Sequence, residues 1–95
     1  MQLVILINAF EVRAGQEEQF KTAWHQTAEH LRCAPGFRST LLHESADPQA
    51  RFRFINVAEW DSSQHFQAAM QEVGEQLRTT TPFQSYPALY QVIAD

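Results

Sequence analysis

The sequence contains one cysteine, Cys33, and three glycines among 95 residues. A single cysteine cannot form an internal disulfide, so nothing indicates an oxidising compartment, and we expect Cys33 to be a buried or half-buried thiol without a chemical role. The apolar run at the amino terminus is too short to span a bilayer and has neither a basic leader nor a small-residue cleavage site. We therefore expect a cytoplasmic protein that does not insert into a membrane.

The sequence also lacks a basic stripe. The net charge is −4, and its seven Lys and Arg residues are scattered from Arg13 to Arg78. This distribution argues against nucleic acid and against anionic membrane as partners. His25 and His30 are five residues apart on one predicted helix and point in different directions, so they cannot share a metal ion. No triad, phosphate-binding loop or zinc site is present, and we expect no metal.

Length and composition predict one domain, residues 1–95. Aromatic residues make up 12% of the chain, which supports a real hydrophobic core. A monomer of this size buries only about 60–65% of the surface that its unfolded chain exposes. The first strand is apolar on both faces, so a second subunit is expected to cover one of them. The sequence thus predicts a homodimer.

The hydrophobic pattern predicts six elements. We expect strands at residues 2–13, 37–44, 51–60 and 88–94, and helices from about Gly15 to Cys33 and after Asp61 or Ser62. The second helix has the apolar stripe Phe66, Met70, Val73 and Leu77. The order βαββαβ is that of the α+β ferredoxin-like sandwich, in which both helices cover one face of an antiparallel sheet.

Asn8 is an amide inside the otherwise apolar stretch from Leu3 to Phe10. Burying an amide without a partner costs roughly 1–3 kcal/mol. Asn8 is therefore either a core amide bonded to neighbouring backbone or a contact for a substrate oxygen.

Strand alternation places Phe52, Phe54, Asn56, Ala58 and Trp60 on one face. Trp60 alone favours ordinary core packing under a helix, with pocket lining as the alternative. Two amides and an indole in an aromatic setting describe a pocket better than a core. Phe54, Phe66 and Met70 are the expected apolar walls, and Tyr90 is a further candidate for substrate contact.

Two histidines are candidate general bases. His43 is expected to share a strand face with Phe37, Ser39 and Leu41, and it would act as a base if that face lines the cavity. His65 flanks the apolar stripe near the amino end of its helix, where the helix dipole lowers imidazole basicity. A structural role remains open for both.

Three segments resemble the antibiotic biosynthesis monooxygenase superfamily. They are Ala34-Pro-Gly-Phe37, Phe54-Ile-Asn-Val-Ala-Glu-Trp60 and Asp61-Ser-Ser-Gln-His-Phe66, together with Asn8 followed by Gly15. The likeness covers roughly residues 3 to 93. It implies ferredoxin-like subunits that pair through their sheets into a dimeric α+β barrel.

The resemblance implies cofactor-free oxygenation, in which an electron-rich phenol is deprotonated and its anion reacts with dioxygen. No metal or flavin is then needed. A related branch degrades heme with an Asn, a Trp and a His ligand to iron. Asn8 and Trp60 match the first two positions, but the ligand position falls near Met70.

The leading hypothesis is a dimeric, cofactor-independent monooxygenase acting on a small aromatic phenol or quinol. In it, Asn8 and Asn56 stabilise the developing anion, Trp60 with Phe54 and Phe66 forms the aromatic wall, and His43 or His65 takes the proton. The alternatives are a non-catalytic dimer that binds a small apolar ligand, and a heme-binding or heme-degrading enzyme.

Overall fold

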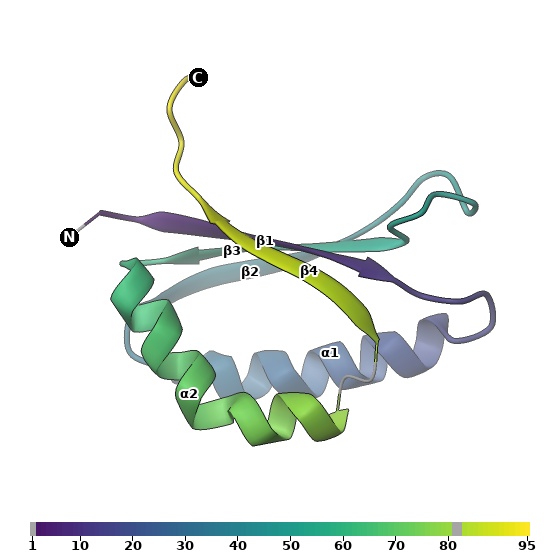
Figure 1. The fold of residues 1–95 in the computed structure, drawn as a ribbon, viewed down its shortest axis with the longest axis horizontal. Coiled ribbons are helices and arrows are strands. Elements are labelled where there is room, and N and C mark those ends of the chain that lie inside the picture. The colour runs from purple at the N-terminus through teal and green to yellow at the C-terminus, as the bar shows by residue number, and fades with distance from the viewer. Residues whose placement is uncertain (1, 81–82) are drawn as a thin grey trace.

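The computed structural model describes residues 2–80 and 83–95 of the chain. The elements, in order, are β1 (Val4–Glu11), α1 (Glu17–Leu31), β2 (Phe37–Glu44), β3 (Phe54–Trp60), α2 (Ser63–Thr80) and β4 (Gln84–Tyr90). The four strands form one antiparallel sheet in the order β2-β3-β1-β4. Both helices lie on the same side of the sheet (Figure 1). The predicted ferredoxin-like βαββαβ fold is confirmed.

The last strand begins four residues earlier than the predicted 88–94, and residues 91–95 lie beyond it. The observed strand therefore includes Pro87, whose missing N–H cannot donate to a strand ladder. In the structure, Pro87 lies opposite Asn8 in β4, which is an edge strand. An edge strand has one side without a partner, so it tolerates the missing N–H.

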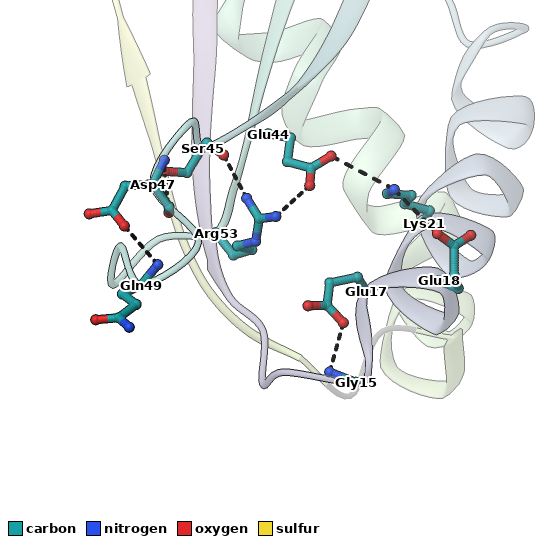
Figure 2. Close-up of polar contacts among 9 residues, drawn as sticks. All are labelled: Gly15, Glu17, Glu18, Lys21, Glu44, Ser45, Asp47, Gln49 and Arg53. Atoms are coloured by element: carbon teal, nitrogen blue, oxygen red, sulfur yellow. Dashed lines mark hydrogen bonds and ion pairs between the residues drawn. The ribbon is translucent and has the colours of Figure 1, made fainter.

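The connection between β2 and β3 is held by local side-chain bonds, which Figure 2 shows. The hydroxyl of Ser45 accepts a hydrogen bond from the backbone amide of Asp47 at 3.0 Å. A carboxylate oxygen of Asp47 accepts one from the backbone amide of Gln49 at 2.9 Å. The Arg53 guanidinium donates to Glu44 and to the carbonyl of Ser45, both at 2.6 Å. The strand β3 begins at Phe54 rather than at the predicted Arg51, and these bonds order the connection that precedes it.

Arg51 joins the same connection to the sheet. Its Nε donates to Glu11 at 2.8 Å, and the hydroxyl of Tyr86 donates to the same carboxylate oxygen at 3.0 Å. The guanidinium also lies over the rings of Phe52 and Tyr86. The bonds from Arg51 and Tyr86 hold the pKa of Glu11 below its usual value, and the bond to Glu11 raises the pKa of Arg51.

The helix α2 begins where the sequence predicts. The hydroxyl of Ser62 accepts from the backbone amide of His65 at 3.2 Å, so Ser62 is the N-cap. The helix then continues through Gly74 to Thr80, although glycine is a weak helix former. No helix in residues 2–80 or 83–95 is long and apolar enough to cross a membrane.

The hydrophobic core has two clusters between the sheet and the helices. In the first, Phe20 of α1 is fully buried and its ring lies 4.8 Å from that of Phe10 and 4.7 Å from that of Phe54. In the second, Trp60 packs edge-on against Phe37 and Phe66. Stacked and edge-to-face aromatic pairs each add about 0.5–1.5 kcal/mol beyond the area that they bury. The second cluster holds β2, β3 and α2 together.

The opposite face of the sheet is apolar and is not covered by either helix. Strand alternation and register place Ile7, Val57, Leu41 and Ala88 on this outer face. Leu41 is 65% exposed and Tyr90 is 50% exposed. A sheet with two apolar faces agrees with the reasoning that predicted a second subunit.

Candidate functional site

A cavity of about 610 Å³ lies between the inner face of the sheet and the two helices. Side chains of β1, β2 and β3 form its floor, and Trp24, Leu31, Phe66 and Met70 of the helices form its walls. Small-molecule pockets typically occupy about 300–1,000 Å³, so the cavity has room for a ligand of several fused rings.

Two amides lie side by side in the floor of this cavity. Asn8 of β1 is paired in register with Asn56 of β3. Directly opposed residues in an antiparallel pair have Cβ atoms about 4.5–5.5 Å apart. Because both strands alternate, Asn8 shares the inner face with Leu6 and Phe10, while Asn56 shares it with Trp60. The structure therefore places Asn8, Asn56 and Trp60 together on the inner face.

Two buried polar atoms in the lining have no hydrogen-bond partner in the described structure. They are the side-chain oxygen of Asn8, Oδ1, and the indole nitrogen of Trp60, Nε1. Leaving such a group unpaired costs about 1–3 kcal/mol, and native proteins retain few of them. One is an acceptor and the other is a donor, so a ligand carrying a hydroxyl and a second oxygen would satisfy both.

Unlike the side-chain oxygen of Asn8, that of Asn56 has a hydrogen-bond partner. This oxygen accepts a hydrogen bond of 2.5 Å from the hydroxyl of Thr40, and the residue is 9% exposed. Because the side-chain oxygen already accepts from Thr40, the side-chain nitrogen of Asn56 is the atom free to donate into the cavity. Thr40 itself lines the cavity from β2.

No residue of the described lining is ionisable. Its polar side chains are amides, hydroxyls and the indole of Trp60, and all other lining residues are apolar. In this dry setting, a hydrogen bond to a developing negative charge is worth more than in water. The cavity thus offers neutral donors to an anion and no general base of its own.

The aromatic wall differs in part from the predicted one. Trp60 is 1% exposed and lines the cavity together with Phe66 and Met70, as expected. Phe54 lies on the same strand face but packs against Phe20 and not in the lining. Phe37 takes its place, with its ring 5.3 Å from that of Trp60.

A β-bulge separates Phe37 from the residues with which the sequence grouped it, Ser39, Leu41 and His43. The register between β2 and β3 shifts between Phe37 and Ser39. Residue Phe37 therefore points inward together with Thr40, whereas regular alternation would place it with His43. The functional residue that sequence reasoning missed is Thr40, because nothing in the local sequence signals the bulge.

His43 and Tyr90 do not reach the cavity. His43 lies opposite Ile55 on the outer face and is exposed, with Nδ1 3.3 Å from the Ile55 carbonyl. Tyr90 lies opposite Ile5, also on the outer face. His43 was a candidate base only if its strand face lined the cavity, and that face does not line it. Neither residue is brought to Asn8 and Trp60 within this subunit.

His65 is part of a structural cluster at the start of α2. Its Nδ1 lies 2.7 Å from the hydroxyl of Ser62, which is 2% exposed. Its ring packs against Gly36, whose φ is +84°, so closely that a Cβ on Gly36 would overlap three side-chain carbons of His65. The cavity lining does not include His65. The glycine is therefore needed for both its backbone conformation and its lack of a side chain.

The remaining predictions for single residues have different outcomes. Cys33 is exposed, contrary to the expected buried or half-buried thiol, because it lies in the turn that follows α1. His25 and His30 are exposed. Within residues 2–80 and 83–95, no group of three or more His, Cys, Asp or Glu side chains is arranged to hold a metal ion.

Comparisons with known proteins agree with the fold. The chain is similar to a candidate monooxygenase from Shewanella loihica PV-4, with 36% identity over 99% of this chain and 97% of that one and a TM-score of 0.91. SnoaB, a cofactor-independent oxygenase from Streptomyces nogalater, shares 22% identity over 100% of this chain and 97% of its own, with a TM-score of 0.80.

A variant of MhuD with two manganese protoporphyrin IX molecules bound per active site shares 23% identity over 97% of this chain and 96% of its own, with a TM-score of 0.77. At that identity, the likenesses to SnoaB and MhuD support the fold alone. A search of curated proteins finds no significant match. The model of the antibiotic biosynthesis monooxygenase family matches residues 3–76, and the chain belongs to that family.

Proposed function

We propose that the protein is a cofactor-independent monooxygenase that oxidises a small aromatic phenol or quinol with dioxygen. The observation that carries the proposal is the pair of unsatisfied buried polar atoms, Asn8 Oδ1 and Trp60 Nε1, in an otherwise apolar cavity. Membership of the monooxygenase family and the similarity to SnoaB support the reaction class.

Each polar group has a role set by its chemistry. The Asn8 oxygen accepts from a substrate hydroxyl and orients the ring. The Trp60 indole and the Asn56 amide donate to the oxygen that becomes negative when the substrate ionises. Phe37 and Phe66, which pack edge-on against the indole, line the cavity with apolar surface and exclude water.

The substrate proton passes to solvent water rather than to a cavity base, since no described lining residue is ionisable. Neither His43 nor His65 lines the cavity, so we assign neither of them as the base. A dry cavity raises the pKa of a phenol, and the two donors oppose that rise by stabilising the anion. The substrates that fit are therefore those acidic enough to ionise with donors alone, such as anthrones and electron-rich naphthols.

The test is oxygen uptake by the purified protein in the presence of a metal chelator, with anthrones, naphthols and quinols as substrates. With ¹⁸O₂, the proposal predicts one labelled oxygen atom in the organic product and the other in water. Uptake equal to that of buffer with every substrate would overturn the proposal.

A non-catalytic binding protein is the second candidate, since the same cavity could hold an apolar ligand without reaction. In that case, ligands would bind but no product would form. Heme is a third possibility. Met70 is the described lining residue with a sulfur ligand, and the lining has no imidazole. A Soret titration with Met70→Ala as control separates heme binding from the other two.

We further propose that the subunit forms a homodimer through the outer face of the sheet. This face exposes Leu41 and Tyr90 and carries Ile7 and Val57 beside them. Exposed apolar surface of this extent is unusual for a monomer and typical of an interface. A homodimer would also bring His43 and Tyr90 into contact with the partner rather than with solvent.

A further inference from the structure

We propose that Thr40 is a positioning residue that fixes the side-chain amide of Asn56 in the orientation needed to stabilise a substrate anion. This inference rests on the proposed oxygenase function, because it explains how one of the cavity donors is aimed.

The hydrogen bond from Thr40 is made to the side-chain oxygen of Asn56 and not to its nitrogen. The hydroxyl of Thr40 lies 2.5 Å from Oδ1 of Asn56, which is short for a hydrogen bond between neutral groups. An amide oxygen and an amide nitrogen differ in role, since the oxygen only accepts and the nitrogen only donates. In the structure the Thr40 hydroxyl donates its proton to this oxygen. The nitrogen of Asn56 is left to face the cavity.

The orientation matters because the amide could otherwise rotate by half a turn. A rotated Asn56 would present its oxygen to the substrate and repel a negative charge. The neighbouring Asn8 oxygen already has no partner, and a second outward-facing oxygen beside it would deepen the negative potential of the floor. Thr40 therefore keeps one amide as a donor and leaves the other as an acceptor.

Thr40 is a diagonal neighbour of Asn56 in the regular part of the β2–β3 ladder, beyond the bulge that follows Phe37. In the register, Thr40 lies opposite Ala58, and Leu42 lies opposite Asn56. The hydroxyl thus reaches diagonally across the strand pair to Asn56.

The test compares Thr40→Val, which keeps the shape but removes the hydroxyl, with Thr40→Ser, which keeps the hydroxyl. Removing a single donor from an anion site lowers kcat by about 10²–10³-fold. Because Thr40→Val frees the orientation of the Asn56 amide, we expect this variant to lower kcat by about tenfold with little change in KM. Thr40→Ser keeps the hydroxyl and should retain most of the wild-type kcat. Thr22→Val makes the same chemical change on the exposed surface of α1 and should leave kcat unchanged.

A readout without turnover keeps the inference separate from the oxygenase proposal. The side-chain amide protons of Asn56, assigned by their loss in Asn56→Leu, should show nuclear Overhauser contacts to the rings of Trp60 or Phe66 in the wild type. These contacts should weaken or average in Thr40→Val and persist in Thr40→Ser. Unchanged contacts in Thr40→Val would overturn the role of Thr40 whether or not the protein oxidises a phenol. Absence of oxygen uptake by the wild type, with the contacts behaving as expected, would overturn only the oxygenase function.

Discussion

The ring of His65 packs on Gly36, and the backbone amide of Asp61 donates to the Gly36 carbonyl at 2.8 Å. This contact joins the start of β2 to the start of α2. It thereby sets the spacing of Phe37 and Phe66, which both pack edge-on against the Trp60 indole.

Two glycine substitutions separate the contact from backbone strain. Gly15 and Gly36 both have positive φ, +94° and +84°, but an added Cβ meets nothing within 4 Å at Gly15. Gly15→Ala should therefore destabilise the fold by about 1 kcal/mol through strain alone. Gly36→Ala should cost about 2–4 kcal/mol because overpacking against His65 is added. Urea unfolding measures both, and equal losses would contradict the role of the contact.

The outer sheet face gives a prediction about assembly. Leu41→Glu adds a charge to an exposed position, so it should leave the subunit folded while weakening the homodimer. Gln71→Glu adds the same charge on the exposed surface of α2 and should not change assembly. Sedimentation velocity at matched concentrations distinguishes the two variants. Dimers of equal stability in both would show that the interface lies elsewhere.

The carboxylate of Glu11 predicts an acid-dependent stability. Bonds from Arg51 and Tyr86 lower its pKa in the folded state relative to the unfolded chain. Its contribution is therefore complete above the unfolded-state pKa and is lost as the pH falls through the lowered folded-state pKa. Glu11→Gln should be less stable than the wild type at neutral pH, and the difference should shrink in acid.

Urea midpoints measured from about pH 7 to about pH 3 check this prediction. Tyr86→Phe removes one of the two donors to Glu11, so it should reduce the pH dependence by less than Glu11→Gln does. A constant difference between Glu11→Gln and the wild type across this range would show that the bonds to Glu11 contribute no stability.

Sequence alternation predicted the floor of the site because β1 and β3 are regular. Asn8, Asn56 and Trp60 all point inward, as the period of two requires. The same rule failed in β2, where the bulge after Phe37 exchanges the faces and brings Thr40 rather than His43 to the cavity. A bulge arises from how two strands pair, so a single strand's sequence does not reveal it.

The other differences also arise from tertiary contacts. The last strand was predicted at 88–94 but begins at Gln84 and contains Pro87, which is tolerated because β4 lies at the sheet edge. His65 was a candidate base because its helical position allowed it to face inward. Its packing on Gly36 is a contact between residues far apart in the sequence, and helical periodicity does not predict it.

The indole nitrogen gives a prediction for Trp60. Trp60→Phe removes the Nε1 donor while keeping an aromatic ring against Phe37 and Phe66. We expect kcat to fall by at least tenfold, with a loss of roughly 1–2 kcal/mol in unfolding free energy from the smaller ring. Steady-state oxygen uptake and urea unfolding measure the two effects. Unchanged kcat would remove the indole from the anion site.

The central claim is that the unpaired oxygen of Asn8 is retained for a substrate. Asn8→Leu removes this buried, unsatisfied group and fills its place with an apolar side chain. The free energy of unfolding should stay the same or rise by about 1 kcal/mol, because the variant no longer buries a lone acceptor.

The most direct measurement is oxygen uptake with the best wild-type substrate, compared between the wild type and Asn8→Leu under conditions where both are folded. The account predicts that kcat/KM falls more than tenfold, which corresponds to about 1.4 kcal/mol of transition-state stabilisation. A variant that consumes oxygen as fast as the wild type would contradict it, and Asn8 would then be only an amide of the core.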